Sequence, residues 1–241
     1  LNPIDAVNDT NPVAVNGYEG GIAIPSVLTN DTLDSVAISL SQATITLVGA
    51  LPTGITFNTA TGEVGVNAST PAGTYTFVYQ ICEVGANPAN CDTALVTVNV
   101  SAPPISAEDD DLTSSPINGY DGGVVGNIFD NNGNGEDTLN LLPVLEVEVT
   151  VTMTNDGGLT GVTIDSDGTI TVPAGTPAGT YFVTYNMCDV LNPTNCDSAI
   201  ITIVVTAAPI DAVNDDYTSE PINADNGGTF PISNNDTLNE A

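Results

Sequence analysis

The chain has 241 residues, with 30 aspartates and glutamates but no lysine, arginine or histidine, and its formal net charge is −30 at pH 7. Without a cationic side chain it can form no side-chain salt bridge, no Lys or Arg clamp on phosphate and no imidazole-based catalytic site. This composition disfavours nucleic acid and anionic membranes as partners. No apolar run approaches the ~20 residues that span a bilayer, so we expect no membrane insertion of this segment.

A short apolar and acidic motif occurs three times along the chain, at residues 3–9, 104–111 and 209–216. The isoleucines at 4, 105 and 210 set spacings of 101 and 105 residues. Such a period is too long for a solenoid repeat and suits a small β domain. We therefore predict one domain over 1–103, a second over 104–208 and the N-terminal part of a third over 209–241. The proline-bearing junctions predict stiff spacers.

Short runs of β-branched and aromatic residues between turn residues predict the strands. In the first repeat they cover residues 4–7, 22–28, 43–48, 55–57, 63–66, 74–82 and 93–100, with a polar loop at 30–34. In the second they cover 124–129, 145–153, 162–164, 169–172, 181–188 and 199–205. Alternation on the strand at 74–82 places Tyr75, Phe77, Tyr79 and Ile81 on one face. On the strand at 93–100 it places on one face Ala94, Val96, Val98 and Val100. About seven strands per repeat and no helical period predict an all-β fold of tandem seven-stranded immunoglobulin-like β-sandwich domains.

Several segments resemble bacterial immunoglobulin-like and cadherin-like repeats. Residues 51–57 (LPTGITF), 61–64 (TGEV) and 71–75 (PAGTY) are similar to the LPxGLxF, TGxIxG and AGTYxF motifs of those repeats. The openings DAVND at 5–9 and VLTNDT at 27–32 resemble cadherin-like signatures. Together with residues 188–197, the chain resembles the tandem repeats of giant secreted surface adhesins of flavobacteria, including the gliding-motility class. The second repeat departs from this pattern, because it lacks the LPxG start and carries an inserted loop at 130–137.

The four cysteines form two local pairs, Cys82 with Cys91 and Cys188 with Cys196. Strand parity places each pair on the outward face of neighbouring strands, at a spacing that a disulfide can bridge. Disulfides would place the chain in an oxidising, extracellular setting. The alternatives are free buried thiols, or a zinc site, for which two separated ligands without histidine are a poor set.

Acidic and amide side chains are expected to gather at one end of each sandwich, which we call its pole. There the start of the first strand meets the loop after the second strand and the loop between the last two strands. Crowded carboxylates favour a hard cation with oxygen ligands, and calcium suits them best. The alternative is that these are plain polar turns. The candidate ligands at the poles are Asp5, Asn8, Asp9, Asp31, Asp109, Asp110, Asp111, Asp137, Asp211, Asp215 and Asp216.

The loop at 130–137 reads DNNGNGED and resembles DxDxDGxxD calcium loops, with Asn at two of the three early acidic positions. Its candidate ligands are Asp130, Asn132, Asn134, Glu136 and Asp137. The same residue types are common in surface turns, so an Asn-Gly-rich turn is the alternative.

Four tyrosines follow glycines or lie in glycine-rich turns. Tyr75 and Tyr181 resemble the tyrosine corner of immunoglobulin-type sandwiches, in which the hydroxyl bonds back to the backbone. Tyr18 and Tyr120 lie in NGY(E/D)GG turns and serve either turn packing or contact with a ligand.

A structural role explains most of these features. We expect a non-catalytic stalk segment of an extracellular, cell-surface adhesin or fibre, stiffened by calcium at its junctions and by disulfides. Its expected partners are the neighbouring repeats, with other fibre chains and surface glycans as further candidates. One alternative is a glycan- or ice-binding module that uses outward threonines such as Thr74, Thr76 and Thr97. A carboxylate-dependent glycosidase is the remote alternative, because the chain has no Trp to form a sugar platform.

Overall fold

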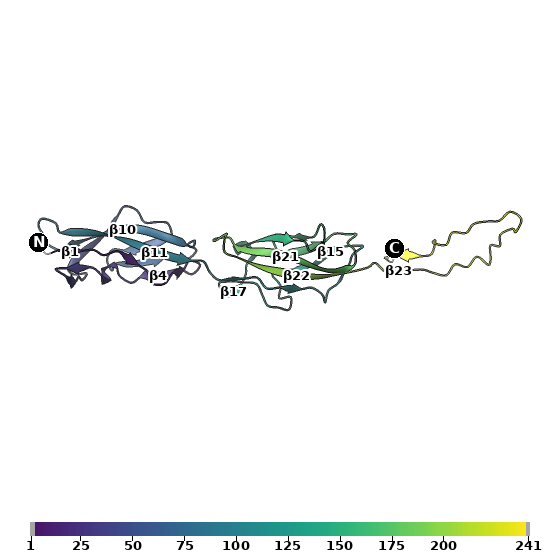
Figure 1. Ribbon diagram of the computed structural model, residues 1–241, viewed down its shortest axis with the longest axis horizontal. Coiled ribbons are helices and arrows are strands. Elements are labelled where there is room, and N and C mark those ends of the chain that lie inside the picture. The colour runs from purple at the N-terminus through teal and green to yellow at the C-terminus, as the bar shows by residue number, and fades with distance from the viewer. Residues whose placement is uncertain (1–2, 240–241) are drawn as a thin grey trace. The chain divides into compact units, whose positions relative to one another are not determined.

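The computed structural model describes residues 3–239, which form β-strands joined by turns, with two short 3-10 helices (Figure 1). The all-β expectation is therefore confirmed. Residue contacts group the chain into two compact units: residues 1–106, 138–149 and 188–196 form the first, and residues 107–137, 150–187 and 197–241 form the second. The sheets follow the sequence repeats, since each sheet takes all its strands from one repeat. The predicted domain boundaries remain a prediction.

Three sheets build the first repeat. The largest has the order β2-β11-β10-β7, with β3 also paired to β11; its strands are β2 (Asp9–Thr10), β3 (Val15–Asn16), β7 (Ala43–Val48), β10 (Gly73–Glu83) and β11 (Cys91–Ser101). The second has the order β4-β9-β8, from β4 (Gly21–Ile24), β8 (Ile55–Asn58) and β9 (Glu63–Val66). The third has the order β1-β5-β6, from β1 (Ile4–Asp5), β5 (Thr32–Leu33) and β6 (Val36–Ala37). The strands β2 and β3 run parallel to β11, while β10 runs antiparallel to it.

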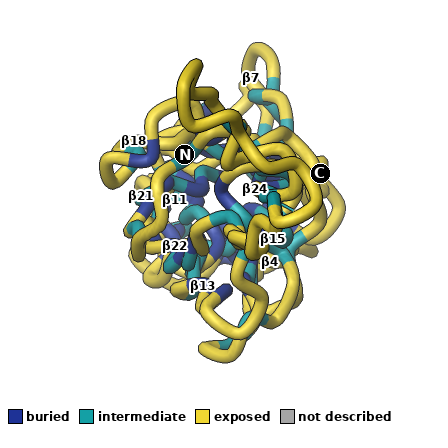
Figure 2. Tube along the Cα trace, turned by 90° about the vertical axis from the view of Figure 1, so that its right-hand side faces the viewer, coloured by how far each residue is buried: buried dark blue, intermediate teal, exposed yellow. Residues whose placement is uncertain are grey.

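The core of the first repeat consists of the inward positions of its strands. Phe77, Tyr79 and Ile81 on β10 are buried, as their alternation predicts, and Val96 and Val98 of β11 are fully covered. Phe57 packs its ring on Phe77 at a centroid distance of 5.0 Å. Figure 2 shows buried segments inside the trace and exposed residues around them. Each such side chain contributes about 1.5–3 kcal/mol when fully buried.

The second repeat has the same plan. Its large sheet has the order β13-β22-β21-β18, with β14 on β22; the strands are β13 (Asp110–Asp111), β14 (Ile117–Asn118), β18 (Val149–Asn155), β21 (Gly179–Asp189) and β22 (Cys196–Thr206). The small sheets are β15-β20-β19 and β12-β16-β17, from β12 (Ile105–Ser106), β15 (Gly123–Asn127), β16 (Thr138–Leu139), β17 (Leu142–Pro143), β19 (Thr163–Ile164) and β20 (Thr169–Val172).

Three predicted strands differ from those in the structure. The opening strand predicted at 4–7 is only β1, which ends at Asp5, and the chain then moves to a different sheet through β2 and β3. The strand predicted at 22–28 ends at Ile24, because Pro25 lacks the backbone donor that a ladder needs. A 3-10 helix, Val27–Thr29, follows, and the hydroxyl of Ser26 accepts a hydrogen bond from its Leu28 N–H. The strand predicted at 145–153 begins only at Val149, after a 3-10 helix over Glu146–Glu148.

A tight hairpin replaces the polar loop predicted at 30–34. β5 pairs with β6 across the two residues Asp34 and Ser35, whose φ angles are 55° and 62°. Two consecutive positive φ values define a type I′ turn, which matches the twist of a two-residue hairpin. The hairpin β16–β17 repeats it with Asn140 and Leu141, at 55° and 64°.

Both predicted disulfides are present. Cys82 lies directly opposite Cys91 in the β10–β11 register, and their sulfurs are 2.02 Å apart. Cys188 and Cys196 are bonded in the same way between β21 and β22. In the chain-entropy model each short loop contributes about 2–3 kcal/mol to stability.

The third copy of the motif contributes β23 (Ile210–Asp211) and β24 (Thr237–Leu238), which pair antiparallel in the register of β1 and β5. Its turn at 223–228 has the same backbone bonds as the turns at 16–21 and 118–123. In all three turns the glycine N–H donates to the asparagine carbonyl four residues earlier, at 2.9 to 3.0 Å. The glycine-rich turn is thus a local feature of each copy.

Candidate functional site: the acidic poles

One aspartate in each copy holds the backbone at the start of that copy. Asp31 Oδ1 accepts a hydrogen bond from Val7 N at 2.7 Å. Asp137 accepts one from Glu108 N at 2.7 Å, and Asp236 one from Val213 N at 2.8 Å. Hydrogen bonds to an ionised acceptor are stronger than neutral ones. These carboxylates therefore fix the first segment where it leaves the regular ladder.

A second set of side chains fixes the same segment to the last strand. Asp92 Oδ2 accepts from Ala6 N at 2.9 Å, and Asp197 Oδ2 accepts from Ala107 N at 3.0 Å. In the other direction, Asn8 accepts from Leu95 N on β11, and Asp109 accepts from Ile200 N on β22, each at 2.8 Å. The polar residues predicted to meet at the pole therefore meet around one strand.

In each of the first two repeats a buried tyrosine hydroxyl contacts the pole aspartate from the core side. Tyr79 is fully buried, and its hydroxyl lies 3.0 and 2.9 Å from the two carboxylate oxygens of Asp31. Tyr185 is equally buried in the second repeat and donates to Asp137 Oδ2 at 3.3 Å. The sequence placed Tyr79 on the inner face but did not assign its hydroxyl. A hydroxyl at an inward position requires a polar partner, and that requirement was the available signal.

One carboxylate oxygen in each repeat is buried without a hydrogen-bond partner among the described residues, Asp9 Oδ2 and Asp110 Oδ2. Burial raises the pKa of Asp9 from 3.8 to about 7, and the neighbouring charge of Asp31 adds to the effect. The pKa of Asp110 rises to about 7 in the same way, and that of Asp137 to about 6, mainly through burial. Burial also raises the pKa of Asp31. At neutral pH such an oxygen favours a proton or a cation.

The donor set fits calcium only in part. The clusters offer carboxylate oxygens, as calcium prefers. However, within residues 3–239 no group of three or more carboxylates or thiolates is placed to hold a metal ion. Amide donors also cover nearby carbonyl oxygens: Asn30 Nδ2 lies 3.3 Å from Val7 O and 3.2 Å from Asn8 O. Calcium at the poles therefore remains a prediction.

The inserted loop at 130–137 is held down by amide nitrogens. Asn132 Nδ2 donates to Asp110 Oδ1 at 2.9 Å and to Asn127 O at 2.8 Å, and Asn134 Nδ2 donates to Asp109 O at 2.7 Å. A calcium loop would direct side-chain oxygens inward instead. The contacts describe a hydrogen-bonded turn seated on the pole.

The predicted ligands separate into two groups. Asp9, Asp31, Asp110, Asp137 and Asn132 come together around the tyrosines, with Asn8, Asp109 and Asn134 on the adjoining backbone. Exposed side chains make up the rest: Asp5, Asp111, Asp130, Glu136, Asp211, Asp215 and Asp216. The pKa values of Asp111 and Asp216 are lowered by hydrogen bonds with Thr113 and Thr218. Asp236, which the sequence did not single out, has the role of Asp31.

Three of the four tyrosines in the glycine-bearing segments donate hydrogen bonds. Tyr75 donates to Pro71 O and Tyr181 to Pro177 O, each at 2.8 Å, as in a tyrosine corner. Tyr18 donates to Glu148 Oε1 at 2.7 Å, and this bond raises the pKa of Tyr18. Tyr120 is 53% exposed.

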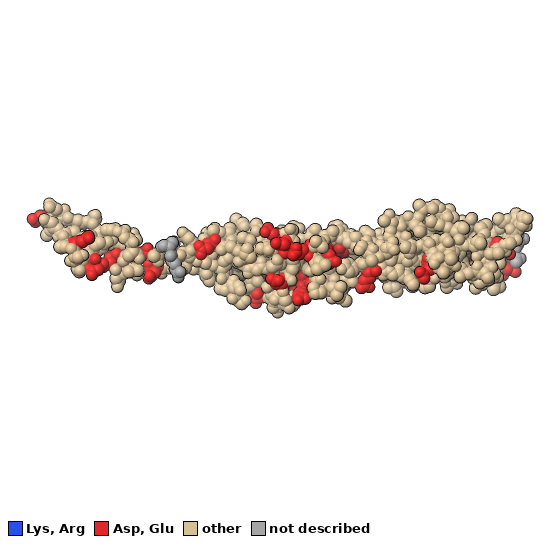
Figure 3. Space-filling model, turned by 180° about the vertical axis from the view of Figure 1, so that it is seen from behind, with Lys and Arg blue, Asp and Glu red and all other residues tan. Residues whose placement is uncertain are grey.

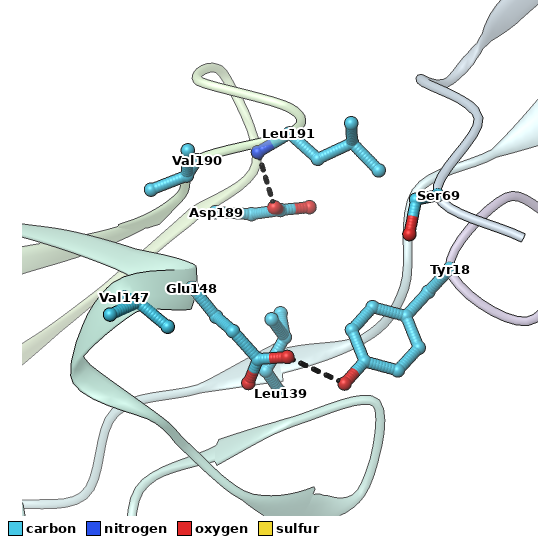
Figure 4. A pocket seen from close by; sticks show the side chains of 8 residues that line it. All are labelled: Tyr18, Ser69, Leu139, Val147, Glu148, Asp189, Val190 and Leu191. Carbon is cyan, nitrogen blue, oxygen red and sulfur yellow. Dashed lines mark hydrogen bonds between the residues drawn. The ribbon is translucent and has the colours of Figure 1, made fainter.

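A small pocket of about 290 Å³ lies beside Tyr18 within the first unit (Figure 4). Within it the Asp189 carboxylate accepts from Leu191 N at 2.8 Å. Its lining comprises Tyr18, Ser69, Leu139, Val147, Glu148, Asp189, Val190 and Leu191.

The surface carries carboxylates in separate groups (Figure 3). Because the chain has no lysine or arginine, every partner of these groups inside the protein is a neutral donor. No helix within residues 3–239 has the length and apolar character needed to cross a membrane.

No protein family and no curated protein matches this sequence. Among solved structures, the human desmocollin-1 ectodomain is similar at 9% identity and a TM-score of 0.33, covering 85% of this chain and 42% of that one. Mouse cadherin-23 EC22–24 is similar at 15% identity and 0.33, covering 86% and 67%. Human protocadherin-24 EC1–2 is similar at 16% identity and 0.34, covering 86% and 99%. At these values the similarity assigns no function, and the resemblance to bacterial adhesin repeats remains a prediction.

Proposed function

We propose that the chain is a non-catalytic structural segment of an extracellular repetitive adhesin or surface fibre, with calcium at its acidic poles. The observation that carries this proposal is the parallel pairing of β2 with β11 and of β13 with β22. The chain enters each repeat along the first strand of the pair and leaves along the second. Tension along the chain would therefore pull the two parallel strands in opposite directions and load all their hydrogen bonds together.

The pairing is reinforced beyond its short backbone ladder. Asn11 is buried, and its side chain bridges the two strands: Nδ2 donates to Asn99 O at 2.9 Å, and Oδ1 accepts from Asn99 N at 2.8 Å. The aspartate and asparagine bonds at the pole hold the same strand pair at its other end. The recurring acidic residues thus serve mechanical attachment, and no catalytic role is needed to explain them.

Pulling the full chain by its ends tests this role. Asn11→Ala removes the two side-chain hydrogen bonds to Asn99, each worth about 1 kcal/mol, and a third to Val13 O, so the first repeat should unfold at lower force. Single-molecule force spectroscopy would measure this, with the second repeat as the internal reference. Thr44→Ala on β7, away from the terminal strands, is the matched control. An unchanged unfolding force for the first repeat in Asn11→Ala would overturn the shear model.

Calcium binding is tested by the melting temperature at two pH values. At pH 7.5 calcium should raise the melting temperature relative to chelator, because it neutralises the buried carboxylates. At pH 4.5 the effect should vanish, since protons occupy the same oxygens. Magnesium controls for general screening of the net charge. Equal melting curves in calcium and chelator at pH 7.5, with no calorimetric heat of binding, would refute the calcium part.

A further inference from the structure

We propose that consecutive repeats are held together by an amide–carboxylate lock, in which the hairpin asparagine of one repeat bonds the glycine-rich turn of the repeat before it. In the first unit Asn140 is the centre of the lock. Its Nδ2 donates to Glu19 Oε1 at 2.9 Å, and its Oδ1 accepts from Asn16 Nδ2 at 2.7 Å. One amide side chain thus uses both its donor and its acceptor.

The same arrangement recurs in the second unit with different residues. Asn239 Nδ2 donates to Asp121 Oδ1 at 2.7 Å, and Asn118 Nδ2 donates to Asn239 Oδ1. Asn239 has φ 61°, close to the 55° of Asn140. The contact occurs in both units, with Glu19 in one and Asp121 in the other, so it is a recurring feature of the turn and the hairpin.

Backbone hydrogen bonds join both halves of the lock to the ends of the linker between the first two repeats, residues 102–104. Gly17 N, in the turn, donates to Ser101 O at 2.9 Å, directly before the linker. Asn140 N, in the hairpin, donates to Pro104 O at 2.8 Å, directly after it. Three residues, 102–104, therefore connect the two halves, and two of them are prolines. A tether this short gives the halves a high effective concentration for each other.

The residues at these positions form complementary sets. The hairpin position carries Asn140 and Asn239 opposite an acidic turn residue, but Asp34 in the first repeat. An aspartate there would face Glu19 or Asp121 as a like charge. It would instead fit a turn with an amide at the acidic position, and the turn of the third copy has Asn226 there. We therefore infer two matched pairs, an acidic turn with a hairpin asparagine, and an asparagine turn with a hairpin aspartate.

The experiment exchanges the pair within the full chain, in chelator so that calcium plays no part. Residual dipolar couplings report whether the first two repeats align as one body. Asn140→Asp should raise the open population about tenfold, because a charge-assisted bond is replaced by repulsion. The double variant E19N with N140D should restore common alignment. Asp34→Asn is the control: it makes the reverse exchange at the equivalent hairpin position of the first repeat and should leave the alignment of the first two repeats unchanged.

Each result has one meaning. Common alignment of the two repeats in Asn140→Asp would overturn the lock, and a double variant as loose as the single one would overturn the pairing rule. Preserved strand signals of β16 and β17 would show that the hairpin itself stays folded. The calcium proposal is judged separately, by the effect of calcium on the wild-type melting temperature, so either idea can fail alone.

Discussion

In chelator, the melting temperature of the protein is expected to fall as the pH rises from about 4 to about 7. Asp9 and Asp110 have pKa values raised from 3.8 to about 7 by burial. Between those limits the folded state keeps protons that the unfolded state has lost. The folded state thus binds more protons, and the free energy of unfolding decreases with rising pH. The upper bound is about 4 kcal/mol for each carboxyl.

The variants Asp110→Asn and Asp111→Asn isolate this effect from the repulsion of 30 acidic residues. Each replaces one ionisable carboxyl group of β13 with a neutral amide, but Asp110 is buried and Asp111 is exposed. The melting temperature of the second repeat is measured between pH 4.5 and 7.5, with hydrogen exchange on β21 as the probe. Its dependence on pH should become flatter in Asp110→Asn and should keep the wild-type slope in Asp111→Asn. Parallel profiles for the two variants would mean that Asp110 does not carry the proton.

Gly17→Ala is expected to destabilise the first repeat selectively and to lower its free energy of unfolding by about 3 kcal/mol or more. A Cβ at Gly17 would lie 2.0 Å from the backbone oxygen of Thr70 and 2.7 Å from Val100 Cγ1. The backbone cannot yield without breaking bonds, because Gly17 N donates to Ser101 O and Gly17 O accepts from Thr70 N, each at 2.9 Å.

Gly73→Ala is the control, since its Cβ would meet only the Tyr75 ring at 3.7 Å. Urea unfolding with hydrogen exchange resolved to β10 and β21 would separate the two repeats. The second repeat should unfold at the wild-type urea concentration in both variants. If the amides of β10 were as protected from hydrogen exchange in Gly17→Ala as in Gly73→Ala, the predicted clash between Gly17 and the Thr70 backbone would be contradicted.

The sequence predicted those features that depend on alternation and repetition. The inward faces of β10 and β11, the opposed cysteines and the all-β class follow from a period of two along each strand. The tyrosine corner follows from its position after a glycine. Such features are local, so residue order is enough to determine them.

The contacts at the poles depend on which segments meet, and there the prediction was incomplete. The sequence assigned Asp9 and Asp31 to a cation, which stays a prediction, and it did not foresee that Asp31 holds Val7 N and the Tyr79 hydroxyl. Asn132 was expected to present an oxygen, yet its nitrogen faces Asp110. Side-chain amides present both a donor and an acceptor, so composition alone cannot decide which atom points inward.

The aspartate that holds the start of each copy bonds a backbone N–H, and this affects how far the sequence can vary between copies. The donors to Asp31, Asp137 and Asp236 belong to Val7, Glu108 and Val213, so an apolar side chain at this position in two copies is replaced by an acidic one in the second. A backbone donor is present at every residue except proline, so mutation at the donor position leaves the bond intact. The same bond can therefore recur in each copy with a different residue at the donor position. Only the carboxylate half of the bond depends on the identity of a side chain.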